Sequence, residues 1–167
     1  TNWLVDQTDC DGFRIDTVKH VEMGFWQDWT PRVQSHLQAI GKTDFLMFGE
    51  VFDGSDAKNG SYTGTMAGGA YALNSMLYYP MYYTAGDVFI WGQPTSGLTS
   101  RYDLLTNYDV SVRERLVNFL DNHDNGRFLE FGKASQDSTK LRGNIDWLLT
   151  SLEIPCLYYG TEQLFDG

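Results

Sequence analysis

An arginine and an aspartate two residues apart form the first group in this sequence that could do chemistry. Residues 12–20 read GFRIDTVKH and are predicted to begin as a β-strand. Side chains alternate along a strand, so Arg14 and Asp16 share one face while Phe13 and Ile15 face apolar packing. A guanidinium beside a carboxylate keeps the carboxylate ionised and fixes its position. The pair therefore suits a nucleophilic carboxylate, although an internal ion pair with a purely structural role explains it equally well.

Two further apolar runs end in acidic residues. Residues 45–50 read FLMFGE and end at Glu50, and residues 117–125 read VNFLDNHDN and contain His123 and Asp124. A single acid after a strand is usually a solvated loop residue. Three strand-like segments that each end in an acid indicate a shared site, because parallel strands present their carboxyl ends at one edge of a sheet.

These segments together resemble a known enzyme family. GFRIDTVKH, FGEVFDG and FLDNHDN resemble the second, third and fourth conserved regions of the α-amylase family, glycoside hydrolase family 13, in the family's order. IPCLYYGTEQ, further along the chain, resembles the family's motif at the last barrel strand. The resemblance implies that Asp16 is the nucleophile, that Glu50 is the general acid/base, and that Asp124 is the third acid, which grips sugar hydroxyls. The apolar run before Glu50 and its anionic neighbours also favour the protonated form that a general acid requires.

The resemblance also implies residues that bind substrate and metal. Lys19 and His20 match positions that contact glucose units on the leaving-group side, and His123 matches one that hydrogen-bonds a substrate hydroxyl. Arg14 is expected to contribute to the same substrate-binding group. The backbone carbonyl of His20 matches a calcium ligand, with the other ligands expected upstream of this chain, so calcium is expected only in the intact parent.

Three polar residues near the last acid carry less information. Asn122 and Arg127 match less diagnostic positions, where a structural role is equally expected. Asp121 occupies a position that varies in the family, and we assign it no catalytic role.

The strands that carry these acids are expected to form a parallel sheet. Apolar segments at 73–79 and 154–159 raise the expected number of strands to five, and continuous apolar strands are typical of a sheet buried on both faces. No Gly-rich phosphate turn follows the first strand, which argues against a doubly wound sheet. Acids at strand ends instead fit a TIM barrel. The expected fold class is therefore α/β, a partial TIM (β/α)8 barrel of about five parallel strands with intervening helices.

Helices are expected between the strands. One helix with apolar residues at helical spacing ends at Gly41 and begins either at Pro31, with Thr30 as its N-cap, or farther upstream. The polar, Gly-rich stretch 53–69 is expected to be a long loop. Other helices are expected at 2–7, 82–89, 100–105 and 141–152, the last with Ser138 as its N-cap.

Composition bounds the class of protein. The 167 residues are 42% hydrophobic and carry a formal net charge of −10, which disfavours disorder and a nucleic-acid partner. No apolar run of membrane-spanning length and no signal peptide is present, so no membrane partner is expected from this chain. Cys10 and Cys156 are expected to be unpaired thiols.

The resemblance places the chain within a larger protein. Residues 1–167 are expected to be part of a single catalytic barrel domain, with the first strands, most of the inserted domain and the C-terminal β domain absent. A whole barrel needs eight strands, so this fragment alone is expected to be inactive. The parent is expected to be secreted, and its oligomeric state is not predicted.

The function implied is a retaining glycoside hydrolase acting on α-1,4-glucans such as starch, glycogen and maltooligosaccharides, most closely an α-amylase. An α-glucan transglycosylase or an α-1,6-glucosidase of the same family would use the same three acids. A non-catalytic glycan-binding relative is the remaining alternative, and the presence of all three acids disfavours it.

Overall fold

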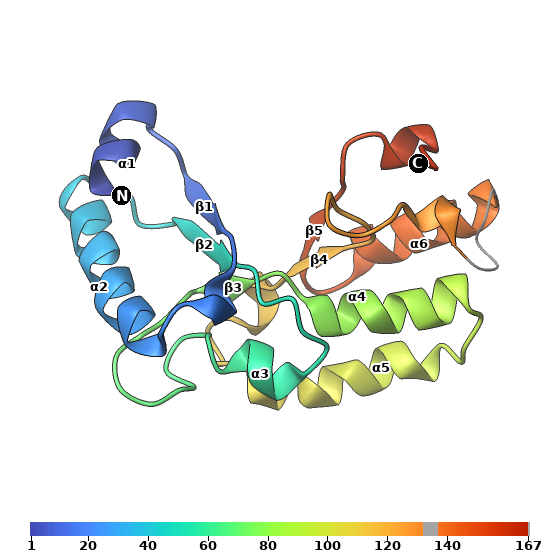
Figure 1. The fold of residues 1–167 in the computed structure, drawn as a ribbon, viewed down its shortest axis with the longest axis horizontal. Helices are drawn as coiled ribbons and strands as arrows, with labels where there is room; N and C mark the ends of the chain where they lie inside the picture. The colour runs from blue at the N-terminus through green and yellow to red at the C-terminus, as the bar shows by residue number, and fades with distance from the viewer. Residues whose placement is uncertain (132–136, 167) are drawn as a thin grey trace. The chain divides into compact units, whose positions relative to one another are not determined.

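The computed structural model describes residues 1–131 and 137–166, which form two compact units (Figure 1). Unit 1 comprises Thr1–Leu77 and Thr106–Leu116, and unit 2 comprises Tyr78–Leu105 and Val117–Gly167. Each unit contains parallel strands and helices, which confirms the α/β class.

Unit 1 is built on a three-stranded parallel sheet. Its strands are β1 (Gly12–Ile15), β2 (Leu46–Gly49) and β3 (Ser75–Met76), in the order β1-β2-β3. The register pairs Ile15 with Gly49, so the carboxyl ends of β1 and β2 lie level. The helices of this unit are α1 (Asn2–Thr8), the 3-10 turn η1 (Val18–His20), α2 (Met23–Ala39), α3 (Asp56–Gly60) and the 3-10 turn η4 (Arg113–Arg115).

Helix α2 begins upstream of the proline that was one of its two predicted starting points. Pro31 lies inside the helix and Thr30 is buried within it, so Thr30 is not an N-cap. Proline removes one backbone hydrogen bond from a helix interior. Aromatic packing around this position offsets that loss, because Trp29 contacts Trp26 at 5.8 Å and Phe13 of β1 at 6.3 Å between ring centroids.

The expected loop 53–69 contains the short helix α3. The side chain of Ser55 caps it by accepting a hydrogen bond from the backbone N–H of Lys58 at 3.3 Å. A β-carbon at Gly60 would meet the carbonyl oxygen of Asn107 at 2.0 Å, so this turn requires glycine. Five residues are too few to show a helical period, which is why the sequence did not predict this helix.

The described residues of unit 2 form a two-stranded parallel sheet and three α-helices. The strands β4 (Val117–Phe119) and β5 (Ile154–Cys156) pair with Phe119 opposite Cys156. All five predicted strands therefore form and every observed strand pair is parallel, although β3 spans only two residues of the expected 73–79. The α-helices are α4 (Tyr79–Ala85), α5 (Ser96–Asp103) and α6 (Ser138–Thr150), and the π-helical turn η2 (Gly86–Ile90) continues α4. The 3-10 turns are η3 (Leu104–Asn107), η5 (Phe128–Glu130) and η7 (Thr161–Gln163). The turn η3 extends into unit 1.

The N-cap of α6 differs from the one expected. Asp137, not Ser138, caps the helix, and its carboxylate accepts from the backbone N–H groups of Thr139 at 3.0 Å and Lys140 at 3.3 Å. The helix contributes to an apolar cluster in the core of this unit. The cluster consists of Ile90, Leu120, Phe128, Leu129, Leu141 and Leu148.

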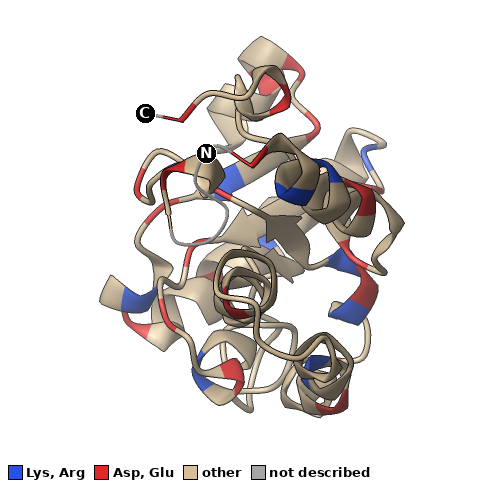
Figure 2. Cartoon of the chain, turned by 90° about the vertical axis from the view of Figure 1, so that its right-hand side faces the viewer, with Lys and Arg blue, Asp and Glu red and all other residues tan. Residues whose placement is uncertain are grey.

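The surface chemistry agrees with the composition. Figure 2 shows acidic positions spread over separate helices and loops. Cys10 is half-buried and Cys156 exposed, and both are free thiols as predicted. Among the described helices, none combines the length and apolarity needed to cross a membrane.

Candidate active site

Backbone hydrogen bonds fix two of the predicted catalytic acids at the strand ends of unit 1. Asp16 directly follows β1 and Glu50 directly follows β2. The N–H of Glu50 donates to the carbonyl of Ile15 at 2.7 Å, and the carbonyl of Glu50 accepts from the N–H of Val18 at 3.0 Å. The two acids therefore occupy adjacent positions at one edge of the sheet, as predicted.

Arg14 connects the two acids. Its Nη1 donates to Oδ1 of Asp16 at 2.5 Å, and its Nη2 donates to Oε2 of Glu50. The sequence predicted Arg14 beside Asp16, and the structure adds the contact with Glu50. Their exposure differs, because 61% of the Asp16 side chain is accessible to solvent but only 11% of the Glu50 side chain. The guanidinium of Arg14 thus bonds to the exposed carboxylate of Asp16 and to the largely buried carboxylate of Glu50.

The backbone turns sharply just after Asp16. Thr17 has a φ of 53°, a left-handed conformation that is uncommon for a β-branched residue. The turn leads into η1, where Nζ of Lys19 donates to the carbonyl of Phe52 at 2.5 Å. His20 follows in the same turn and is exposed. Lys19 therefore ties the loop after β1 to the loop after β2, and the substrate contacts expected of Lys19 and His20 remain predictions.

A single lysine pairs with two acids of the loop before β1. Nζ of Lys42 lies 2.9 Å from a carboxylate oxygen of Asp9 and 2.8 Å from one of Asp11. The hydrogen bonds that Lys42 donates to the carboxylates of Asp11 and Asp9 raise the pKa of Lys42. Over residues 1–131 and 137–166, no three His, Cys, Asp or Glu side chains gather into a possible metal site.

The third predicted acid lies in unit 2, in a turn held by an asparagine side chain. Oδ1 of Asn122 accepts from the backbone N–H groups of Asp124 and Asn125, both at 2.9 Å. Nδ2 of Asn122 donates to the hydroxyl of Tyr79 at 3.1 Å, which anchors the turn to α4. Nε2 of His123 lies 3.1 Å from Oδ2 of Asp124. Both His123 and Asp124 are exposed, and the substrate contacts expected of them remain predictions.

A buried aspartate supports the start of this turn. Asp121 accepts hydrogen bonds from Oγ1 of Thr161 at 2.8 Å and from the N–H of Phe128 at 3.3 Å. Burial raises the pKa of Asp121, and these hydrogen bonds and nearby Arg127 oppose the rise. The guanidinium carbon of Arg127 lies 4.2 Å from the ring centroid of Tyr158. Asp121 and Arg127 thereby join the turn after β4 to the segment after β5.

The predicted residues therefore form two groups, one in each unit. Arg14 contacts both Asp16 and Glu50 in unit 1, and His123 contacts Asp124 in unit 2. The sequence left a structural role for Asn122 as one of two expectations and assigned Asp121 no catalytic role, and the structure shows that both residues position the turn. The signal that could have identified Asp121 is an acid after the apolar run 117–120, since a buried carboxylate must find hydrogen-bond donors.

Sequence and structure comparisons relate this chain to known α-amylases. The family described as "Alpha amylase, catalytic domain" matches residues 1–167. The "Beta/alpha-amylase" of Paenibacillus polymyxa is 37% identical over 172 residues, which cover 99% of this chain and 13% of that protein. An Anoxybacillus α-amylase structure superposes with a TM-score of 0.84 at 31% identity, covering 99% of this chain and 35% of that one. The α-amylase of Geobacillus thermoleovorans, solved in complex with acarbose, gives a TM-score of 0.83 at 29% identity, with coverages of 99% and 35%.

The chain thus spans only a small part of the relatives that it matches. Its parallel strands and intervening helices form part of a (β/α)8 barrel, as the sequence predicted. The match over every residue and the arrangement of the acids lead to one conclusion: the chain belongs to the α-amylase family, glycoside hydrolase family 13.

Proposed function

We propose that the full-length protein is a retaining glycoside hydrolase that cleaves α-1,4-glucans such as starch, glycogen and maltooligosaccharides, most closely an α-amylase. The observation that carries this proposal is the bridge from Arg14 to both Asp16 and Glu50 at level strand ends. Neighbouring strands lie about 4.8 Å apart. Retaining enzymes place their two carboxyl groups about 5–5.5 Å apart, so the arrangement suits double displacement.

Each acid has a distinct step in this mechanism. The carboxylate of Asp16 attacks the anomeric carbon while Glu50 gives its proton to the leaving glycosidic oxygen. Glu50 then takes a proton from water, which attacks the same carbon and releases Asp16. The open side chain of Asp16 suits the attacking group, and the enclosed side chain of Glu50 suits the group that exchanges a proton.

The contact between Arg14 and Glu50 bears on the order of these steps. A guanidinium stabilises the ionised form of a carboxylate, which is the form that Glu50 needs as the base of the second step. The first step needs the protonated form, so we propose that substrate binding weakens this contact. Arg14 would then remain bonded to Asp16 and hold the nucleophile in position.

The remaining predicted residues are assigned to substrate binding. We propose that Asp124 and His123 hydrogen-bond sugar hydroxyls, and that His20 and Lys19 contact the leaving-group side. For Lys19 this requires exchange of its present bond to the carbonyl of Phe52. The acarbose bound by the Geobacillus relative supports a saccharide ligand for this group of enzymes.

Calcium is proposed for the intact protein only. Calcium takes about 6–8 oxygen ligands, and the carbonyl of His20 is the single ligand that we assign to this chain. The other ligands are expected upstream of this chain, so no catalytic step is assigned to the ion. On the resemblance alone, we also propose that the protein is extracellular and that residues 1–167 are inactive in isolation.

A transglycosylase is the second candidate. The cyclomaltodextrin glucanotransferase of Bacillus licheniformis is 30% identical over 162 residues, covering 94% of this chain and 20% of that protein. Such an enzyme passes the same glycosyl intermediate to a sugar hydroxyl instead of water. Chromatography of the products from soluble starch separates the two, because a hydrolase yields linear products and a cyclising transferase yields rings.

The proposal is tested by Glu50→Gln in the full-length protein. The substitution removes the transferable proton and preserves the shape of the side chain, so hydrolysis of starch should fall by about 10²–10⁴-fold. Maltooligosaccharide binding, measured by calorimetry, should change little. Glu114→Gln, at an exposed acid of η4, is the matched control and should retain full activity. A loss below about tenfold in Glu50→Gln would remove Glu50 from the mechanism.

The stereochemical course tests the role of Asp16. Two displacements at the anomeric carbon preserve its configuration, so proton NMR should show the α-anomer as the first product from an α-linked substrate. The β-anomer as first product would mean a single displacement by water, with Asp16 acting as a base.

A further inference from the structure

Two Asn-Gly pairs occur in this chain, and the structure places them in opposite surroundings. They are Asn59-Gly60 and Asn125-Gly126. Asparagine is a thermally labile residue, and a following glycine leaves its own main-chain nitrogen uncovered because it has no β-carbon. That nitrogen lies within reach of the side-chain amide of the asparagine, and attack between groups joined in this way is fast relative to a bimolecular step. No role in catalysis or substrate binding is assigned above to either asparagine.

The first pair is protected. Asn59 is fully buried, and its Nδ2 donates to the carbonyls of Asp53 at 2.7 Å and Ser55 at 3.1 Å. Gly60 is the last residue of α3, so the helix holds the backbone that carries the attacking nitrogen. Water, which must complete the reaction, is excluded from this side chain.

The second pair lies at the surface of unit 2, in the turn that carries Asp124. Asn125 and Gly126 are both partly exposed and belong to no helix or strand. Over the described part of the chain, the backbone N–H of Gly126 donates to no acceptor. The side chain of Asn125 donates one hydrogen bond, from Nδ2 to Oδ1 of Asn122 at 2.7 Å. The attacking nitrogen and the amide that it attacks are therefore both accessible to water.

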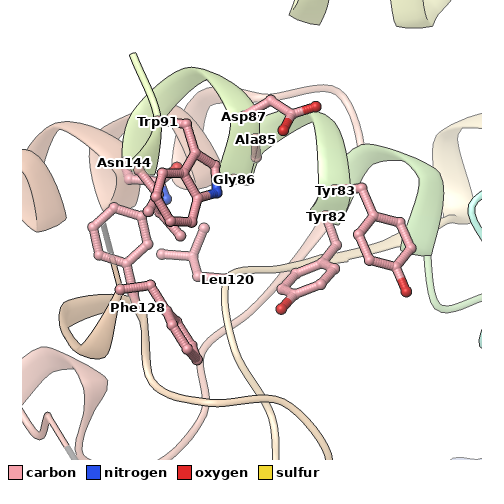
Figure 3. A pocket seen from close by; sticks show the side chains of 11 residues that line it. Tyr82, Tyr83, Ala85, Gly86, Asp87, Trp91, Leu120, Phe128 and Asn144 are labelled. Carbon is pink, nitrogen blue, oxygen red and sulfur yellow. The ribbon is translucent and has the colours of Figure 1, made fainter. Parts of the chain in front are cut away.

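Both ends of this turn are fixed in the core of unit 2. Leu120 before it and Phe128 after it belong to the apolar cluster, and Figure 3 shows both side chains lining one pocket. Asp121 is bonded to the hydroxyl of Thr161 and to the N–H of Phe128. A change in the length of the main chain between these ends must therefore be absorbed within the turn, at Asp124 and its neighbours.

We propose that Asn125-Gly126 is a site of spontaneous deamidation whose products displace Asp124. The nitrogen of Gly126 bonds to Cγ of Asn125, the bond from Cγ to Nδ2 breaks, and the amide nitrogen leaves as ammonia with the proton that the Gly126 nitrogen gives up. Water then opens the cyclic imide at either carbonyl, which yields aspartate or isoaspartate. The modification rests on the turn itself, whereas the loss of activity rests on the proposed function.

Both products disturb the placement of Asp124. Each replaces a neutral amide by a carboxylate, which is ionised at neutral pH and cannot donate to Oδ1 of Asn122. The new negative charge also lies next to that of Asp124. Isoaspartate in addition lengthens the main chain by one methylene, about 1.5 Å, between ends that are fixed.

The modification is tested by ageing the full-length protein in mildly alkaline buffer and digesting samples with trypsin. Peptides 116–127 and 59–101 contain the two pairs, and fragment masses locate the exchange of an amide for a carboxyl group relative to an unaged sample. The deamidated fraction at Asn125 should exceed that at Asn59 by about tenfold or more, because Asn59 is buried and bonded. Equal fractions at the two sites, or none at Asn125, would overturn the proposal.

Asn125→Gln separates this reaction from other causes of ageing. Glutamine keeps the amide but must close a larger ring, so the variant should hold its own starting activity on starch while the wild type loses activity as Asn125 is converted. Gly126 is left unchanged, because the side chains of Glu130 and Phe131 occupy the place where a β-carbon would lie. An equal decline in the variant and the wild type would show that deamidation does not inactivate the protein.

Asn125→Asp imitates one product, since it introduces the charge without lengthening the main chain. Its kcat on starch should be about three- to tenfold below that of the unaged wild type. Gln93→Glu is the matched control, because it adds the same charge at an exposed residue between η2 and α5 and should leave kcat unchanged. If both variants match the wild type and fully deamidated protein also keeps its activity, the proposed effect on Asp124 is wrong.

The two proposals fail in different ways. If Asn125 is deamidated but the unaged protein never hydrolyses starch, the deamidation site stands and the hydrolase proposal is wrong. If hydrolysis proceeds and Asn125 remains an amide throughout ageing, the hydrolase proposal stands and the deamidation site is wrong.

Discussion

The acids of unit 1 and the acid of unit 2 are positioned by different means. Asp16 and Glu50 follow paired strands, and the main chain of Glu50 is bonded to both Ile15 and Val18. Asp124 lies beyond the end of β4, in a turn whose backbone is bonded to the side chain of Asn122. The first arrangement depends on strand register, which most side chains can satisfy. The second depends on one amide.

This difference explains which parts of the site can be altered safely. A strand end is shared with the whole sheet, so its position persists when a neighbouring side chain changes. A turn organised by one side chain loses its geometry when that side chain is removed. The side chains at strand ends should therefore matter for chemistry, and those in the turn for placement.

Arg14→Lys would alter unit 1 most strongly among substitutions that leave all three acids in place. Lysine cannot donate to Asp16 and Glu50 in the fixed fork of a guanidinium, so the two carboxylates would lose their common partner. We expect kcat/KM on starch to fall by about 10²-fold with little change in thermal stability. Arg32→Lys, at an exposed arginine of α2 paired with Asp28, should leave the rate unchanged. An Arg14→Lys enzyme of normal activity would show that strand register alone positions the acids.

The sequence predicted the acids that follow paired strands better than it predicted the turn bonded to Asn122. Arg14 and Asp16 share a strand face and Glu50 ends the next strand, and each follows from side-chain alternation and a level register. The fold class followed from the same apolar runs. The turn at Asn122 did not, because its geometry depends on hydrogen bonds between side chain and backbone that no periodicity records.

The errors in the predicted helix starts also have local causes. Helix α2 continues through Pro31 because aromatic contacts with β1 outweigh the preference of proline for a helix start. Helix α6 is capped by Asp137 because its carboxylate reaches two N–H groups, whereas the adjacent serine is already helical. Both outcomes depend on contacts that one residue type cannot specify alone.

Asn122→Ala would test the side-chain-held turn. It removes the acceptor for the N–H groups of Asp124 and Asn125, so Asp124 should lose its fixed position. We expect kcat on starch to fall by about tenfold, less than for Arg14→Lys because all reacting groups remain. Tyr79→Phe, which removes only the hydroxyl that accepts from Asn122, should cause a smaller loss. Equal losses in the two variants would mean that the anchor on α4, and not the turn itself, places Asp124.

Asp109 extends the comparison to a loop of unit 1 that carries no catalytic residue. Its Oδ2 accepts from both the N–H and the hydroxyl of Thr65 at 2.9 Å, and its Oδ1 accepts from Ser111. These hydrogen bonds, that from the N–H of Thr65 first, hold the pKa of Asp109 well below its ordinary value of 3.8. The loop is therefore held by a side chain, as at Asn122, but with a charged acceptor.

Asp109→Asn should lower the stability of the full-length protein at pH 7 by about 1 kcal/mol, a modest value because the carboxylate is only partly buried. The folded pKa lies below the unfolded one, so the stabilisation is complete above the ordinary value of 3.8 and is lost as pH falls through the lower folded pKa. Urea unfolding of wild type and variant should therefore give curves that differ at pH 7 and converge in acid. Asp28→Asn, which breaks an exposed pair on α2, should change stability little at either pH. A difference for Asp109→Asn that persists unchanged in acid would mean that the shape of the side chain, and not its charge, holds the loop.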